Sequence, residues 1–181
     1  MQKLYTLCLV AVATVLAVQP VQPVGAVDTR VLTDAQLRVI RENCETVKVN
    51  LTTLHKNDAV LRVNLGQRYE NISRRLMAPL NGRIAANNLD GVEKAQITVK
   101  YTEELRKFTT KYIEYETLTQ TLMQTNCNTN MADFYRNIET ARELRLEVGE
   151  HVDELQSLAD QYRQKLIEFK RELEVGGGSN V

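Results

Sequence analysis

The last third of the chain carries an almost unbroken heptad repeat of apolar residues. They follow one another in alternating steps of four and three: Phe134, Ile138, Ala141, Val148, Val152, Leu155, Ala159, Tyr162, Leu166, Phe169 and Leu173. Only Arg145 interrupts the series. Apolar residues at a mean spacing of about 3.5 form one stripe along a helix, and such a stripe has to be buried against other helices. The sequence therefore predicts a helical protein of the coiled-coil type.

An earlier segment has the same pattern and predicts a long helix from Asp34 to about Ala86. Thr33 and Gln36 form a capping box at its start. Its apolar seam is Leu37, Ile40, Cys44, Val47, Leu51, Leu54, Leu61 and Leu65, then Tyr69, Ile72, Leu76, Leu80 and Ile84, with Asp58 at one position. The change of phase after Leu65 is a stutter, which locally unwinds a supercoil. A cap at Asn57 that divides the helix in two is the alternative.

Two short polar connections divide the rest of the chain. A turn at residues 87–91 and a loop at 126–130 leave helices at about 92–123 and 131–174. Short connections make neighbouring helices antiparallel. We therefore expect an all-α fold, an elongated antiparallel three-helix coiled-coil bundle over residues 34–174. The glycine-rich residues 175–181 are expected to form a flexible tail.

The N-terminus has the pattern of an export signal over residues 1–26. A short start with Lys3 precedes an apolar stretch, two prolines and small residues up to Ala26. Residues 27–33 would then be a leader, and the mature protein would be periplasmic, cell-surface or secreted. The alternative is an uncleaved anchor, which would be the only contact with the membrane.

Charge and histidine content narrow the classes of function. The chain has 23 Lys and Arg, 23 Asp and Glu, and a formal net charge of zero. Nucleic-acid binders usually carry a basic surface, so we expect no nucleic-acid partner. His55 and His151 are the only histidines, and neither has a zinc-binding spacing. We expect no catalytic residue, no metal and no cofactor, and hence a protein that is not an enzyme.

Export would leave two cysteines, Cys44 and Cys127, and we expect them to form a disulfide. Two free buried thiols are the alternative. Asp58 lies 14 residues after Cys44, and Arg145 lies 18 residues after Cys127, about four of them in the loop. At about 1.5 Å per residue both charges then stand about 21 Å above the cysteines. We predict that Asp58 and Arg145 form a polar pair within the bundle or at its edge, unless rotation of the last helix turns Leu144 inward and Arg145 outward.

Residues 54–70 mix polar and apolar side chains more densely than any other segment. The candidate interaction surface consists of His55, Arg62, Asn64, Gln67 and Glu70. The alternative is a polar layer that fixes the register of the bundle.

Together with Leu76-Met77, Asn81, Arg83, Phe134-Tyr135 and Ala141-Arg142, this segment resembles uncharacterised exported helical (coiled-coil) proteins of small-genome bacteria. The resemblance covers most of the chain after the signal, and implies an envelope or extracellular helical protein without supplying an activity.

Three functions remain open at this point. The first is a non-enzymatic exported coiled-coil protein that acts through a protein partner at the cell envelope, or through self-association. The second is a periplasmic chaperone of the holdase type, or an adaptor. The third is a ligand-binding helical bundle with a polar site between its helices near Asp58 and Arg145.

Overall fold

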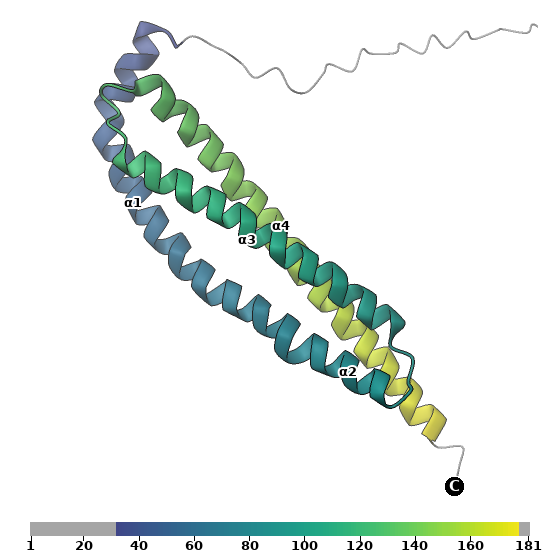
Figure 1. Cartoon of the computed structure of the whole chain (residues 1–181). Coiled ribbons are helices and arrows are strands. Elements are labelled where there is room, and N and C mark those ends of the chain that lie inside the picture. The colour runs from purple at the N-terminus through teal and green to yellow at the C-terminus, as the bar shows by residue number, and fades with distance from the viewer. Residues whose placement is uncertain (1–31, 178–181) are drawn as a thin grey trace, which may run out of the picture. The chain divides into compact units, whose positions relative to one another are not determined.

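A computed structural model describes residues 32–177, and within that range the chain is entirely helical apart from its connections. The elements are α1 (Asp34–Asn71), the π-helical segment η1 (Ile72–Met77), α2 (Ala78–Ala86), α3 (Val92–Gln124) and α4 (Met131–Gly177) (Figure 1). The expected signal at 1–26 lies outside the described residues, as do residues 27–31 of the expected leader. None of the described helices is both long enough and apolar enough to cross a membrane.

The first long helix begins at the predicted capping box. The backbone N–H of Thr33 donates to Gln36 Oε1 at 2.9 Å, and the backbone N–H of Gln36 donates to Thr33 Oγ1 at 3.3 Å. These two bonds satisfy backbone donors that the first turn leaves without partners. Because α1, η1 and α2 follow one another directly, the helical path continues to Ala86, and the alternative break at Asn57 is wrong.

The π-helical segment explains why the predicted seam is wrong at Leu76. The N–H of Ala78 bonds to the carbonyl of Ser73, five residues back, so this turn holds one residue more than an α-helical turn. The extra residue turns Met77 into the core, where it is 1% exposed, and leaves Leu76 61% exposed. Leu61 is also outside the seam, at 53% exposed, because the neighbouring Arg62 takes the inward position.

The turn between α2 and α3 depends on close backbone packing. Asn88 has a φ of 54°, in the left-handed region, and its N–H donates to the Ala85 carbonyl at 3.0 Å. A Cβ on Gly91 would lie 2.8 Å from Cγ2 of Ile84, so only glycine fits there without a shift. Asp90 Oδ1 accepts a bond from the Val92 N–H at 3.1 Å and caps the start of α3.

Two apolar clusters hold the helices together. The cluster at the cysteine end contains Cys44, Tyr112, Tyr115, Leu122, Cys127, Phe134 and Ala141. The cluster at the other end contains Tyr69, Met77, Tyr101, Phe108, Leu155, Leu158 and Tyr162. Figure 1 shows α3 and α4 side by side, while α1 curves away from them in its middle.

The heptad of α4 packs largely as the sequence predicts, but its end differs. Leu173 is 46% exposed, and α4 continues to Gly177, three residues beyond the helix end predicted at 174. Residues 178–181 lie outside the described range.

Polar contacts between the first helices set their register. Thr52 lies against Met123, Asp58 bonds Tyr115, Ser73 bonds Thr102 and Asn81 bonds Thr98. Residue numbers on α3 therefore fall steadily as those on α1 and its continuation rise.

Candidate functional site

The candidate site lies where α1 passes the middle of α3 and α4. Of its 38 residues, α1 buries only Cys44, Asp58 and Tyr69. We call the region formed by Asp58–Glu70 of α1, Leu105–Tyr115 of α3 and Arg145–Val152 of α4 the waist. Because few α1 side chains fill the space there, polar groups and cavities come together at the waist.

A carboxylate from α1 is held at one edge of the waist by α3 and α4. The Tyr115 hydroxyl donates to Asp58 Oδ2 at 2.7 Å. Arg145 donates from Nε to Oδ2 at 2.9 Å and from Nη2 to Oδ1 at 3.2 Å. The Asp58 side chain is 10% exposed and that of Arg145 is 51% exposed. The structure thus brings the predicted pair together at the edge of the bundle, with Leu144 packed against the core beside it.

The electrostatics of this cluster favour the charged form of Asp58. Burial raises the pKa of the carboxyl, but the hydrogen bonds from Arg145 and Tyr115 and the charge of Arg145 outweigh it, so the pKa lies below its usual value. Burial and the neighbouring carboxylate raise the pKa of the Tyr115 hydroxyl. At neutral pH the cluster is therefore a carboxylate with a phenol and a guanidinium as donors.

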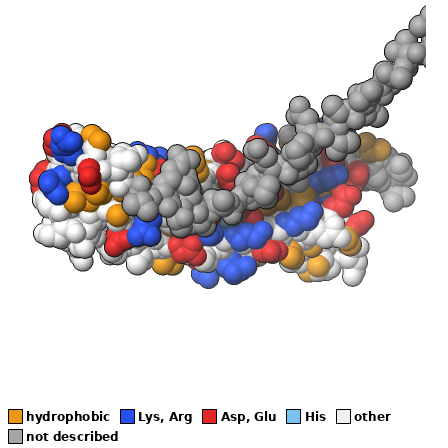
Figure 2. Space-filling model, turned by 90° about the horizontal axis from the view of Figure 1, so that it is seen from above, with side chains coloured by type: hydrophobic (Ala, Val, Ile, Leu, Met, Phe, Trp, Pro, Cys, Tyr) orange, Lys and Arg blue, Asp and Glu red, His pale blue; other side chains and the backbone are white. Residues whose placement is uncertain are grey.

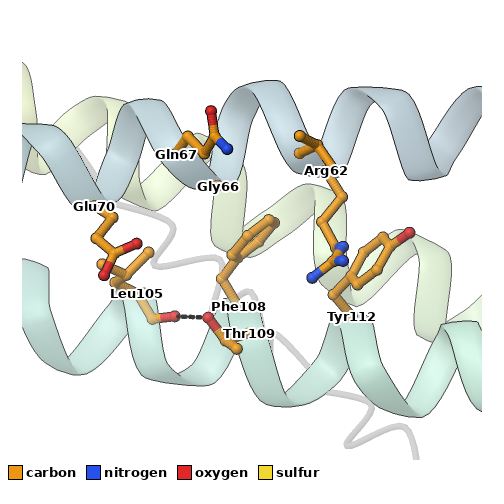
Figure 3. Close-up of a pocket in the computed structure, with 9 residues that line it drawn as sticks. Arg62, Gly66, Gln67, Glu70, Leu105, Phe108, Thr109 and Tyr112 are labelled. Atoms are coloured by element: carbon orange, nitrogen blue, oxygen red, sulfur yellow. Dashed lines mark hydrogen bonds between the residues drawn. The ribbon is translucent and has the colours of Figure 1, made fainter.

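A pocket of about 390 Å³ opens between α1 and α3 (Figure 3). Its walls are Arg62, Val63, Gly66, Gln67 and Glu70 from α1, and Leu105, Phe108, Thr109 and Tyr112 from α3. Gly66 matters here because nothing lies within 4 Å of where its Cβ would be, so the α1 wall is open at that position. The pocket therefore combines aromatic and aliphatic surface with three polar α1 side chains.

Two polar groups in this pocket have no hydrogen-bond partner among the described residues. Tyr112 is 4% exposed, yet its buried hydroxyl is unpaired, as is the buried Nε of Arg62. The guanidinium carbon of Arg62 lies 4.9 Å from the centre of the Tyr112 ring, so the charge rests on the aromatic face. Burial is the main reason that the pKa of Tyr112 is raised. Arg62 Nε and the Tyr112 hydroxyl are both hydrogen-bond donors, so they favour a ligand with acceptor atoms.

A second cavity, of about 220 Å³, lies beside the first at the waist. Arg62, Phe108 and Tyr112 line both spaces, and Asp58 and Arg145 line only the second. The two cavities are therefore neighbours that share three side chains.

The structure brings part of the predicted interaction surface together. Arg62, Gln67 and Glu70 line the pocket between α1 and α3. Asn64 lies on another surface of α1, where it shares a shallow hollow with Gln67. His55 lines neither waist cavity and lies three residues before Asp58 on α1. Three of the five residues of the predicted surface thus line one pocket.

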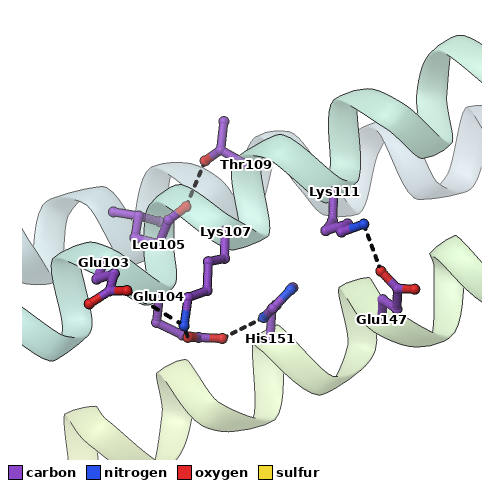
Figure 4. A network of polar contacts seen from close by, with 8 residues as sticks. All are labelled: Glu103, Glu104, Leu105, Lys107, Thr109, Lys111, Glu147 and His151. Carbon is purple, nitrogen blue, oxygen red and sulfur yellow. Dashed lines mark hydrogen bonds and ion pairs between the residues drawn. The ribbon is translucent and has the colours of Figure 1, made fainter.

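Sequence reasoning missed a polar network between α3 and α4 (Figure 4). Glu104, 8% exposed, bonds Nδ1 of His151 and accepts from Lys107 Nζ at 3.2 Å. Burial raises the pKa of Glu104, but these bonds outweigh it and hold the pKa below its usual value. Lys111 and Glu147 add an ion pair at 3.0 Å. Glu104 and Lys107 are three residues apart on α3, but no spacing within one helix identifies His151 and Glu147 of α4 as the partners of Glu104 and Lys111.

The two cysteines lie at disulfide-bonding distance, with their Cα atoms 5.9 Å apart. Glu45 lies near both sulfurs, and the three residues offer atoms within 4.8 Å of one another. Bonded sulfurs supply no thiolate for a metal ion, so the pair is better explained as a covalent link between α1 and the loop after α3.

On the described part of the surface seen in Figure 2, acidic and basic side chains are interspersed. No family model, curated protein or solved structure matches this chain. The function therefore has to be argued from the residues of the waist.

Proposed function

We propose that this chain is an exported, non-enzymatic helical protein that binds a protein partner at the cell envelope through its waist. The observation that carries the proposal is the pair of unpartnered buried groups, Arg62 Nε and the Tyr112 hydroxyl, on two side chains that line an open pocket. Buried polar groups normally have partners, so a partner whose acceptor atoms reach these groups when the two side chains turn toward the pocket would complete them. Tyrosine and arginine are also the side chains that most often dominate binding energy.

Export is supported by the signal-like residues 1–26 and by the cysteines at bonding distance. Disulfides persist in oxidising compartments and are rare in the cytosol. We propose on this basis that the mature helical unit works outside the cytoplasm.

For the architecture we propose an elongated antiparallel three-helix coiled coil. The falling register of the α1–α3 contacts and the heptad seam of α4 support it. In such a bundle the cysteine pair holds one end together and the apolar cluster around Tyr69 and Leu155 holds the other. A partner can therefore reach the waist between them without unfolding either end.

Photo-cross-linking tests the binding proposal. A photoreactive residue at Gln67 samples the pocket, and one at Val99, 67% exposed on α3, is the matched control on another surface. We expect one envelope protein to be cross-linked from Gln67 and not from Val99. The same products from both positions would contradict the assignment of the waist.

A small-ligand function is the second candidate, and the cavity of about 220 Å³ beside Asp58 and Arg145 supports it. A ligand that fits there would contact apolar walls and compete for the donors of Arg145. The two candidate functions are distinguished by the thermal unfolding of the purified chain, measured in the presence of envelope extracts that have been separated by molecular size. Stabilisation by the small-molecule fraction alone supports a ligand, and stabilisation by the protein fraction alone supports a partner.

A further inference from the structure

A groove lies between η1–α2 and α4, apart from the two cavities of the waist. It has a volume of about 520 Å³, and its floor is apolar, formed by Ile72, Met77, Pro79, Leu80, Ala159 and Leu166. Leu76 lines it and remains 61% exposed, because the π-helical turn moves this side chain out of the core. Grooves that bind the apolar face of an amphipathic helix have apolar surface of this kind.

The charged side chains of this groove are mainly basic. Arg75, Arg83 and Arg163 line it together with one acid, Asp160. Within residues 32–177, Arg75 and Arg83 form no ion pair, and Arg163 reaches only Asp160, at 3.5 Å. A helix that docks here should therefore carry apolar and acidic side chains on one face.

The chain itself has a face of this kind on α4. Leu146 is 70% exposed, and Glu143, Glu150 and Asp153 lie three before, four after and seven after it, on the same side of the helix. Arg142 also lies on this side, four before Leu146, where it pairs with Glu139. These three acids form no ion pair with any other residue that the structure describes. Gly149 lies on α4 near Leu146 and has no side chain, and nothing lies within 4 Å of where its Cβ would be. Another helix can therefore come close to the α4 backbone at this position.

We propose that the arginine-rimmed groove of one copy binds the acidic α4 face around Leu146 of a second copy. The lengths agree: Glu143 to Asp153 spans about 15 Å along α4, and Arg75 to Arg83 spans about 12 Å along the groove. The two surfaces differ, so the contact is heterologous. Such a contact builds an open chain of copies unless two reciprocal contacts close a dimer around a two-fold axis. This inference does not rest on the proposed function, although Leu146, Gly149 and Glu150 belong to the α4 segment of the waist.

Sedimentation equilibrium of the mature chain tests this contact. We expect concentration-dependent self-association that weakens at least tenfold between low salt and about 0.5 M salt, since ionic contacts are screened. Arg83→Glu and Glu150→Lys should each weaken association at least tenfold. Combining both in one chain, or mixing the two variants, should restore it, because the charges are complementary again. The combined variant also controls for misfolding.

Matched variants separate this contact from general surface effects. Leu146→Ser should weaken association at least fivefold, whereas Val99→Ser, at a site 67% exposed on α3, should not. A monomer at all concentrations would overturn the proposal. So would unchanged association in Arg83→Glu, or a monomer that instead binds vesicles of anionic lipid through the arginines.

Discussion

Replacing Arg145 by leucine should leave the Asp58 carboxylate with one of its three hydrogen bonds. Breaking a buried ion pair usually costs about 3–5 kcal/mol. The Arg145 side chain is 51% exposed, so water reaches it, and the Tyr115 bond at 2.7 Å remains. We therefore expect a smaller loss in the free energy of unfolding at neutral pH, about 2 kcal/mol. Urea unfolding followed by helical circular dichroism measures it.

The loss of stability in Arg145→Leu should depend on pH, and the pKa of Asp58 determines in which direction. In the wild type the pKa of Asp58 is lowered, so its contribution to stability is present at neutral pH and is lost only as pH falls through that lowered value. In Arg145→Leu the burial remains while the guanidinium is gone, so the pKa should rise above its usual value. The protonated carboxyl then fits the site better than the charged one. The stability gap between variant and wild type should shrink from about pH 7 to about pH 4.

A double-mutant cycle and a matched control complete the test. Adding Asp58→Asn to Arg145→Leu should recover much of the loss, because the amide needs no counter-charge and still accepts from Tyr115. Arg142→Leu removes an exposed pair with Glu139 on the same helix and should cost less than about 0.5 kcal/mol. Strictly additive losses in the cycle, or equal losses in Arg142→Leu and Arg145→Leu, would refute the reasoning.

Three further predictions concern stability. Replacing Cys44 and Cys127 by serine opens a loop with a sequence separation of 83 and should lower the free energy of unfolding by about 4–5 kcal/mol, measured in urea; insensitivity to reduction of the wild type would contradict this. In Glu104→Gln the free energy of unfolding should fall less steeply at acid pH, because the wild type loses the contribution of Glu104 as pH falls through its lowered pKa. The same dependence of the free energy of unfolding on acid pH in both proteins would count against this. Gly91→Ala should destabilise the fold by about 1 kcal/mol through the 2.8 Å contact, whereas Gly82→Ala, with nothing within 4 Å, should stabilise it by about 0.5–1 kcal/mol; calorimetric midpoints that move in the same direction would be inconsistent with that turn.

The helices follow from the sequence because periodicity and caps are local. The capping box at Thr33 and the heptad of α4 depend on residues a few positions apart, and both appear in the structure. Counting helical rise from the cysteines also suffices to place Asp58 beside Arg145. These inferences need only spacing and one covalent anchor.

Other features depend on neighbours that the sequence does not identify. The π-helical turn moves Leu76 outward and Met77 inward, and a seam read in steps of three and four cannot include its extra residue. Glu104 is buried because His151, 47 residues away, supplies its partner. The unpartnered Tyr112 hydroxyl could not be predicted from the sequence, since its lack of a partner depends on how closely α1 approaches.

The most direct test of the central claim is the affinity of the partner captured at Gln67 for two arginine variants of α1. Arg62 contributes an unpaired Nε to the waist pocket, whereas Arg38 is exposed on the same helix away from it. Calorimetric titration of the purified partner should show at least a tenfold loss of affinity in Arg62→Ala, equivalent to about 1.4 kcal/mol, and no loss in Arg38→Ala. Equal affinity of wild type and Arg62→Ala would contradict the assignment of the waist as the binding surface.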